Sequence, residues 1–322
     1  MKSGTRPSSS WLAPVPPTVA IEIAARRVTV VELGRSGGSA VVSAHASEGL
    51  PADAVLPGLT NDNIPTPALV SDALRRALDR AGLRSTRRAA LIVPDSVARV
   101  SLLPFDQVPS RQADLDQLIR WQLKKATPFP IEDAQVSHFV AHTDGAATTM
   151  AAVVARRAVI AQYESVAAAA GIQAGVVDLA SLNVMNAIMG AGATVPGDWL
   201  VVCLAAEATT LAILRGQQLM FYRHRTAVDE EPLSALVHQT AMFHEDRLGG
   251  TQFARVWLCG AGMPDGRSDH LRKEIGDRLG VAVETVDVRP AAELRDRAAA
   301  APEFLDALAA PVGMLLRERK VA

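Results

Sequence analysis

The feature that most constrains the fold of this chain is an order of predicted elements that occurs twice. Alternating and apolar runs that begin at Thr18 predict a β-meander, with turns at residues 25–27 and 37–38. Helix-type and strand-type segments then alternate up to about residue 190. After Pro196 and Gly197 the same order restarts, with three strand-like runs followed by alternating helices and strands. This duplication predicts an α/β protein of two related lobes that face each other across a cleft.

The predicted domains follow from this order. A chain of 322 residues is longer than one hydrophobic core usually sustains, which also favours two lobes. We expect a disordered tail over 1–17, a first lobe over 18–190 and a second lobe over 196–322. Within the first lobe, about 95–155 forms a small inserted subdomain. The leucine- and alanine-rich helix that ends the second lobe could return to the first.

Charge and hydropathy exclude several classes of partner. The chain has 33 basic and 34 acidic residues, so its net charge gives no electrostatic reason to expect nucleic acid or an anionic membrane as the main partner. No apolar run reaches transmembrane length, and the N-terminal residues lack the apolar core of a signal peptide. The expected location is therefore the cytoplasm, with membrane contact only through partner proteins.

The stretch Ile119–Ala134, "IRWQLKKATPFPIEDA", is the most distinctive local feature. An amphipathic helix carries Trp121 and a basic pair, and we expect it to be stopped by Pro128 and Pro130, which flank Phe129. Two interpretations of the aromatic residues stay open. They could anchor a binding partner, or they could pack into the core of the small subdomain.

Several segments, taken in order, resemble the PilM family of type IV pilus assembly proteins, a branch of the actin-like ATPase superfamily. They are "AIEIAARRVTVVEL", "LLPFDQVPSRQADLDQLIRWQLKKATPFPIEDAQVSHFV", "VVARRAVIAQYESVAAAAGIQAGVVDLASLNVMNA", "QLMFYR" and "APVGMLLRE". The resemblance implies an actin-like fold. It has two duplicated RNase H-like lobes, with a small inserted subdomain in the first and a reduced lid subdomain in the second.

The positions that match the nucleotide-binding turns of the superfamily are degenerate. In the first turn Glu22 matches the acidic position, but Ala24 replaces the glycine and Arg26 lies among the positions of hydroxyl residues. In the second turn Cys203 replaces the acidic residue and Ala205 replaces the glycine. Glycine matters there because it lets backbone N–H groups approach phosphate oxygens.

Only the third nucleotide element keeps its glycines, Gly260 and Gly262. The link from His224 to Glu231 is short where family members place a longer lid against the nucleoside. The resemblance therefore implies a pseudo-ATPase without catalytic residues, metal or cofactor. ATP and magnesium belong only to the alternative interpretation, an active actin-like ATPase or a sugar-kinase-like phosphotransferase.

The resemblance also implies a partner and a place to bind it. In the family, a groove beside the small subdomain receives the short cytoplasmic N-terminal peptide of an inner-membrane protein, PilN. The matching residues here are Trp121, Pro128, Phe129 and Pro130. A cytoplasmic motor ATPase is a further partner of such a scaffold. The platform of a type II secretion system, which shares this fold, remains an alternative machine.

Other chemically active residues are given structural interpretations. Cys203 and Cys259 each lie in an apolar strand-like run and are expected to be buried as small hydrophobic side chains, not paired as a disulfide or a metal site. His238 and His244 are six residues apart on a helix and so do not share a face. Asp95, which follows a strand, is expected to cap a helix or turn.

Overall fold

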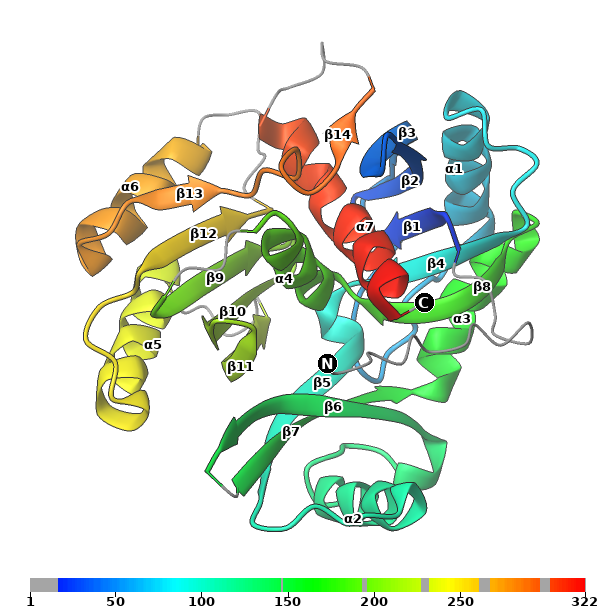
Figure 1. Cartoon of the computed structure of the whole chain (residues 1–322). Coiled ribbons are helices and arrows are strands. Elements are labelled where there is room, and N and C mark those ends of the chain that lie inside the picture. The colour runs from blue at the N-terminus through cyan, green and yellow to red at the C-terminus, as the bar shows by residue number, and fades with distance from the viewer. Residues whose placement is uncertain are drawn as a thin grey trace, which may run out of the picture.

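The structure is a computed structural model, and it describes residues 17–145, 147–192, 196–226, 232–260, 267–295 and 302–321. Two large sheets and one small sheet organise the chain (Figure 1). The predicted tail, apart from residue 17, and Gly262 lie outside the described residues. So does most of the predicted short link before Glu231.

The first lobe is built on a six-stranded sheet with the order β14-β3-β2-β1-β4-β8. Its strands are β1 (Val19–Ile23), β2 (Arg27–Ser36), β3 (Ser39–Gly49), β4 (Arg88–Val93), β8 (Gln173–Leu179) and β14 (Glu293–Leu294). The first three form the predicted antiparallel meander, and β4 and β8 run parallel to β1. Gly37 and Gly38 have positive φ angles of 59° and 92°, which the tight turn between β2 and β3 requires.

The second lobe repeats this topology in a five-stranded sheet with the order β11-β10-β9-β12-β13. Its strands are β9 (Asp198–Leu204), β10 (Ala208–Arg215), β11 (Gln218–Thr226), β12 (Arg255–Cys259) and β13 (Val283–Thr285). Again the first three are antiparallel, and the last two run parallel to the first. The predicted duplication is confirmed strand by strand.

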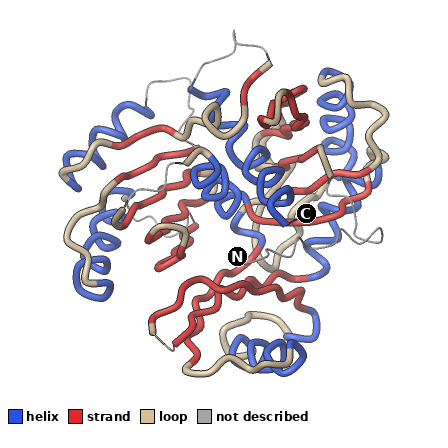
Figure 2. Tube along the Cα trace, viewed as in Figure 1, coloured by secondary structure: helices blue, strands red, loops and turns tan. Residues whose placement is uncertain are grey.

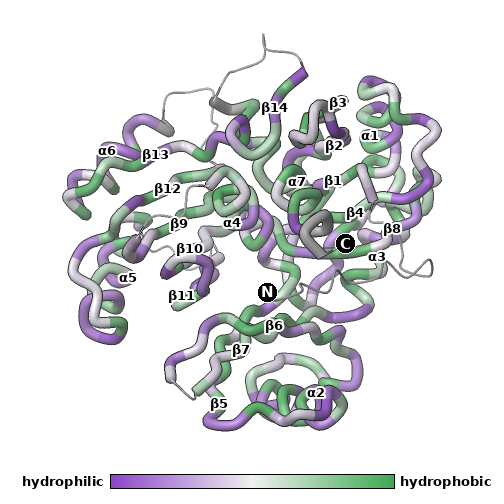
Figure 3. The backbone as a smooth tube through the Cα atoms, viewed as in Figure 1, coloured by the Kyte–Doolittle hydropathy of each residue, from purple (hydrophilic) through white to green (hydrophobic). Residues whose placement is uncertain are grey.

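Helices cover both faces of each sheet, as Figures 1 and 2 show. They are α1 (Pro67–Arg80), α3 (Arg157–Ala169), α4 (Ala180–Gly190), α5 (Leu233–Leu248), α6 (Arg267–Leu279) and α7 (Pro302–Val321). α1 and α3 share a core with the outer face of the first sheet, and α5 and α6 share one with the outer face of the second. α4 and α7 lie between the sheets, in a core to which both lobes contribute. Figure 3 shows how hydrophobic residues follow the strands of both large sheets.

The alternation of side chains along a strand decides which residues face the space between the lobes. In β1, Ala20 belongs to the central core and Ile21 to the outer one, so Glu22 faces inward again. In β9, Val201 faces the central core and Val202 the outer core, so Cys203 also faces inward. Both positions were expected at the cleft, and the pleat places them there.

The last described elements complete the first lobe. α7 contacts β1, β2 and β4 as well as α4, and β14 pairs with β3 at the edge of the first sheet. Among the described residues, no helix is both long enough and apolar enough to span a membrane.

The small subdomain is inserted between β4 and α3. It consists of a three-stranded sheet and one helix, formed by β5 (Ala98–Phe105), α2 (Gln112–Leu123), β6 (Ala134–Asp144) and β7 (Ala147–Arg156). The prediction that prolines stop α2 was wrong about where the helix ends. The helix ends at Leu123, before Pro128 is reached. The N–H groups of Ala126 and Thr127 both bond to the carbonyl oxygen of Leu123, 2.9 and 3.0 Å away, and form a closing turn. Thr127 precedes a proline, which disfavours further helix.

Candidate functional site

The two hairpin turns predicted at the cleft face each other across a cavity of about 290 Å³. The β1–β2 turn contributes Ala24 and Arg26, and the β9–β10 turn contributes Ala205. The two turns close alike: the Ala24 N–H donates to the carbonyl oxygen of Arg27 (2.9 Å) and the Ala205 N–H to that of Ala208 (2.8 Å). These two N–H groups are thus bonded within their own turns.

Neither turn uses the left-handed backbone that would demand glycine. Asp53 is the only residue other than glycine with a positive φ angle in the described part of the chain. Alanine is therefore compatible with both turns. The effect of the two alanines is on the cavity, because Ala24 and Ala205 both line it with their methyl groups.

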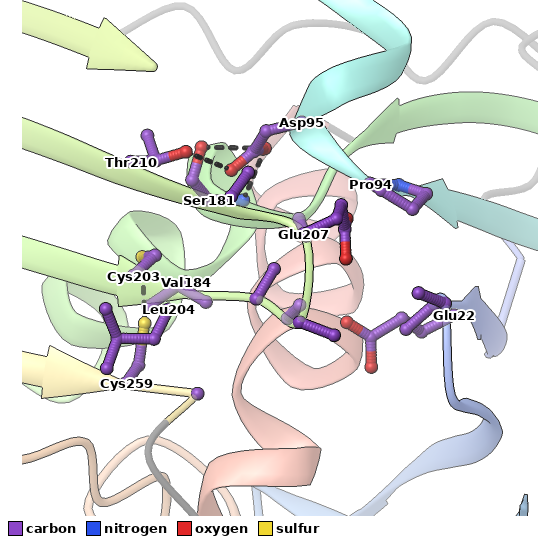
Figure 4. A pocket seen from close by; sticks show the side chains of 18 of the residues that line it. Glu22, Pro94, Asp95, Ser181, Val184, Cys203, Leu204, Glu207, Thr210 and Cys259 are labelled. Atoms are coloured by element: carbon purple, nitrogen blue, oxygen red, sulfur yellow. Dashed lines mark hydrogen bonds between the residues drawn. The ribbon is translucent and has the colours of Figure 1, made fainter. Parts of the chain in front are cut away.

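Four acidic side chains line the cavity, together with two arginines, Arg26 and Arg27. Glu22, Asp95, Glu207 and Asp306 all line it, and Figure 4 shows the first three around the open space. Arg27 lies 3.7 Å from Glu22 and forms its ion pair. Burial raises the pKa of Glu22 and also that of Glu207, because a charged carboxylate loses water there. Oε2 of each of these two glutamates is buried and has no hydrogen-bond partner among the described residues.

Gly260, at the end of β12, is held by α7. Its N–H lies 2.8 Å from both carboxylate oxygens of Asp306. The glycine has φ of 76°, and a Cβ atom there would lie 1.7 Å from the carbonyl oxygen of Leu204. Glycine at this position is therefore required by the contact between β12 and the end of β9, whatever the cavity binds.

Asp95 connects the two lobes. It lies in a short 3₁₀ helix, η1 (Asp95–Val97), directly after β4. One carboxylate oxygen accepts bonds from the N–H and the hydroxyl of Ser181 in α4 (3.0 and 2.9 Å), and the other accepts from Thr210 of the second lobe (2.8 Å). Asp95 caps a helix, as predicted, but the helix is α4, which is distant in sequence.

The bond to Thr210 continues into a second connection. Oγ1 of Thr210 donates to Asp95, so it accepts from Nδ1 of His224, 2.9 Å away. Nε2 of His224 then accepts from the hydroxyl of Ser96, 3.1 Å away. These residues, Asp95, Ser96, Ser181, Thr210 and His224, are called the interlobe network below. No sequence pattern indicated it, since its members come from four separate elements.

The two cysteines lie side by side at the floor of the cavity (Figure 4). Cys203 and Cys259 are directly opposite each other on the parallel strands β9 and β12, and their sulfur atoms are 2.8 Å apart as free thiols. The predicted burial holds for Cys259, which is 4% exposed, while Cys203 is half-buried. Their proximity was missed, because parallel pairing brings together residues that are distant in the chain.

The histidines predicted not to share a face do not meet. His244 is buried, and its Nε2 donates to Asp198 (2.8 Å), which also accepts from Arg215 (2.7 Å). His238 is exposed on α5. In the part of the chain that the structure describes, no three His, Cys, Asp or Glu side chains are arranged to hold a metal ion.

The structure separates the two aromatic residues of the distinctive stretch. Trp121 is 72% exposed on α2, so the interpretation that it packs into the subdomain core is wrong. Phe129 is half-buried against that core, and its neighbours Pro128 and Pro130 are exposed. Of the predicted partner residues, Trp121 is thus the most available for a contact.

A second cavity, of about 320 Å³, lies beside the small subdomain, and none of the four predicted partner residues lines it. We call it the junction cavity, because three parts of the molecule meet there. It is lined by Phe139 of β6, by Leu182, Met185, Asn186 and Met189 of α4, by Leu214, Gln217 and Leu219 of the β10–β11 hairpin, and by Arg317 of α7. Phe139 and the adjacent Val140 are 41% and 55% exposed. The sequence signals that could have found this site are the two methionines one helical turn apart and the exposed apolar pair on an edge strand.

Two lobes of one repeated topology, with a cleft between them and a subdomain inserted in the first, define an actin-like protein. The sequence model of the family described as "Type IV pilus assembly protein PilM" matches residues 20–244. The chain therefore belongs to the PilM family, as its sequence predicted. No curated protein matches the chain.

Solved structures agree with this fold. A chain of a "PilM-PilN type IV pilus biogenesis complex" is similar with a TM-score of 0.77 and 19% identity, over 94% of this chain and 98% of that one. The cytoplasmic domain of EpsL, an inner-membrane component of the type II secretion system of Vibrio cholerae, has a TM-score of 0.50 and 10% identity, over 94% of each chain. At these identities both similarities show the fold alone.

Proposed function

We propose that this chain is a non-catalytic scaffold of a type IV pilus assembly machine and binds the cytoplasmic N-terminal peptide of an inner-membrane, PilN-like protein. Membership of the PilM family and the name of the similar complex support this partner. In this proposal the protein works in the cytoplasm and reaches the inner membrane only through its partners. A cytoplasmic motor ATPase is a further proposed partner.

The observation that carries the proposal is the contrast between the two cavities. Four carboxylates line the cleft between the lobes beside Arg26 and Arg27, and its backbone donors at Ala24, Ala205 and Gly260 are bonded to the protein's own oxygens. A triphosphate needs such donors free and is repelled by carboxylates. These features support a cleft that does not hold a magnesium-bound nucleoside triphosphate.

The junction cavity has the opposite character. Its lining is mostly apolar, with methionines that adapt to different shapes and an amide or guanidinium group at a few points. β6 is also an edge strand of the small sheet, so its outer backbone groups could pair with an extended peptide. We assign the peptide to this cavity. The exposed Trp121 lies on α2, which covers the opposite face of the small sheet, so it stays a separate predicted contact.

Peptide binding to purified variants tests this assignment. A synthetic peptide matching the cytoplasmic start of the membrane partner should bind the wild type, measured by titration calorimetry. Phe139→Ala should weaken binding by about 1–3 kcal/mol, because it removes an aromatic anchor from the cavity. Phe129→Ala is expected to act similarly only if the half-buried ring also reaches the peptide.

The matched control is Met242→Ala, which removes an apolar side chain that is 49% exposed on α5, on the outer face of the second lobe. Its peptide affinity should equal that of the wild type. Circular dichroism should show all variants folded. Unchanged affinity in a folded Phe139→Ala protein would refute the assignment of the peptide to the junction cavity. Absence of binding to the wild type would refute the proposed partner.

The non-catalytic part of the proposal has a separate test. A ligand present at a hundred times its dissociation constant stabilises a protein by about 2.7 kcal/mol, which a melting scan detects readily. We expect no shift of the melting temperature with millimolar ATP and magnesium, and no phosphate release above a protein-free blank. Stabilisation by ATP that disappears with EDTA would favour the active ATPase or phosphotransferase instead.

A further inference from the structure

The pair of thiols at the floor of the cleft does not line the junction cavity, and the proposed function gives it no chemical role. Cys203 and Cys259 are separated by 56 residues of sequence and yet occupy the same register position on neighbouring parallel strands. Both side chains face the space between the lobes, and their sulfur atoms are 2.8 Å apart.

The backbone at this position already suits a covalent link. Neighbouring strands lie roughly 4.7–4.9 Å apart, and the Cα atoms of a disulfide usually lie roughly 4.4–6.8 Å apart. Because the two cysteines are paired directly, the register of the strands brings their side chains together, and the spacing of neighbouring strands falls within the Cα range of a disulfide. In addition, the half-buried Cys203 lines the cavity of about 290 Å³, so a small reagent in the cleft can reach it.

We propose that Cys203 and Cys259 form a peroxide-sensitive dithiol that closes to an intramolecular disulfide, with Cys203 as the reacting thiol and Cys259 as the resolving one. The half-buried Cys203 meets the oxidant from the cavity, whereas Cys259 is 4% exposed and sits behind it.

The chemistry balances with one peroxide per pair. The Cys203 thiolate attacks one oxygen of hydrogen peroxide, the O–O bond breaks, and the leaving hydroxide takes the thiol's proton to form water. Cys203 is then a sulfenic acid. The sulfur of Cys259 attacks it, the S–O bond breaks, and a second water leaves. Two thiols have supplied two electrons, and the products are one disulfide and two waters.

The order of the two steps agrees with the environment of each thiol. The contact with Cys259 lowers the pKa of Cys203, although burial and the nearby Asp95 and Asp306 leave it above the usual value. The same contact, followed by burial, raises the pKa of Cys259 well above its usual value. Both pKa values lie above the usual value, so both thiols react more slowly than an exposed thiolate, and the greater exposure of Cys203 decides which one reacts first.

The first experiment uses the wild-type chain. After incubation with hydrogen peroxide, the intact mass should fall by two hydrogen atoms, free-thiol titration after denaturation should fall from two groups to none, and a non-reducing peptide map should contain the Cys203–Cys259 peptide pair. Dithiothreitol should restore both thiols. The oxidised protein should melt at a higher temperature, because the link restricts its unfolded state.

Two variants test the roles. In Cys259→Ser, Cys203 should stop at the sulfenic acid and be trapped by dimedone. In Cys203→Ser, Cys259 should remain reduced under the same treatment. Peptide affinity at the junction cavity should be the same before and after oxidation, which keeps this test independent of the proposed function. Thiols that stay reduced in the folded wild type, over-oxidation without pairing, unfolding before pairing, or a dimedone adduct on Cys259 would each overturn the proposal.

Discussion

Glu22 is a buried carboxyl group with an incomplete set of partners. Strand alternation turns it toward the cleft, where it is 7% exposed, with Arg27 at 3.7 Å and one oxygen without a hydrogen bond from any described residue. Burial raises its pKa, and Asp306 and Asp95 add to the effect. Ionisation of Glu22 is therefore less favourable in the folded state than in the unfolded chain.

Glu22→Gln should stabilise the protein at neutral pH. The folded pKa of Glu22 lies above the unfolded value, so the folded state holds the proton longer and its stability falls as pH rises above about 4.5. Glutamine cannot ionise and removes this penalty, which amounts to about 1.4 kcal/mol for each unit of pKa. Thermal melts across pH should show a higher melting temperature for the variant at neutral pH and equal values below about pH 4.5.

Asp72→Asn is the control for Glu22→Gln. Asp72 is exposed on α1 and forms an ion pair with Arg75 on the same helix, so its loss should change stability by at most about 0.5 kcal/mol. A Glu22→Gln protein less stable than the wild type at neutral pH would mean that the ion pair with Arg27 outweighs the cost of burial.

The positions of Glu22 and Cys203 at the cleft were predictable, but the acidic residues Glu207 and Asp306 beside them, and the contacts between cleft residues, were not. The alternation of side chains along β1 and β9 turns Glu22 and Cys203 toward the cleft, and this alternation can be recognised within a single segment of the sequence. The 2.8 Å contact between Cys203 and Cys259, and the bonds from Asp95 to Ser181 and Thr210, depend on how distant strands pair and how the lobes meet. No pattern within one segment carries that information.

At the level of elements, α7 and α4 pack with their backbones in close contact. Gly313 of α7 lies against the backbone of α4, and a Cβ atom there would be 1.8 Å from the carbonyl oxygen of Asn183 and 2.8 Å from the nitrogen of Ala187. Backbone atoms cannot move aside as a flexible side chain can. The two helices must therefore separate if this residue gains a methyl group.

Gly313→Ala should destabilise the protein by about 1–3 kcal/mol or prevent folding. The sign of this change in the free energy of unfolding is informative. Without the close contact, alanine in place of glycine inside a helix would stabilise the protein by up to about 1 kcal/mol, because alanine has the higher helix propensity. Chemical denaturation measures the change. Gly34→Ala is the control, since its Cβ would meet nothing closer than 3.6 Å. A Gly313→Ala protein as stable as the wild type would show that α7 can shift without loss.

Long periodic elements were predictable, and short or terminal features were not. The strands of both meanders, β1 to β3 and β9 to β11, match the alternating and apolar runs of the sequence. β14 has two residues and no period to detect, so only its pairing with β3 defines it. The end of α2 was misplaced because the prolines forbid further helix without fixing where the last turn closes.

At the level of the whole molecule, the interlobe network holds the cleft in its observed arrangement. Thr210 is its central member, because its hydroxyl donates to Asp95 of the first lobe and accepts from His224 of its own. The residue is 3% exposed, so both partners would lose a bond that water cannot easily replace.

Thr210→Val keeps the shape of the side chain and removes the hydroxyl. We expect a loss of about 1–3 kcal/mol and faster amide exchange around η1 and the start of α4, measured by hydrogen–deuterium exchange. Thr209→Val, at the adjacent and more exposed position of β10, is the matched control and should exchange like the wild type. Equal exchange in both variants would mean that apolar packing alone keeps the lobes together.

The position of α7 also has a consequence for biosynthesis. The helix covers β1, β2 and β4, yet the ribosome makes those strands first and α7 only after the whole second lobe. Until α7 emerges, the nascent first lobe exposes the apolar face that this helix will cover. Contacts between such distant segments slow folding and leave intermediates open to aggregation. We therefore expect the two lobes to reach their native state together after translation. Until then, chaperones would protect the exposed face of the first sheet.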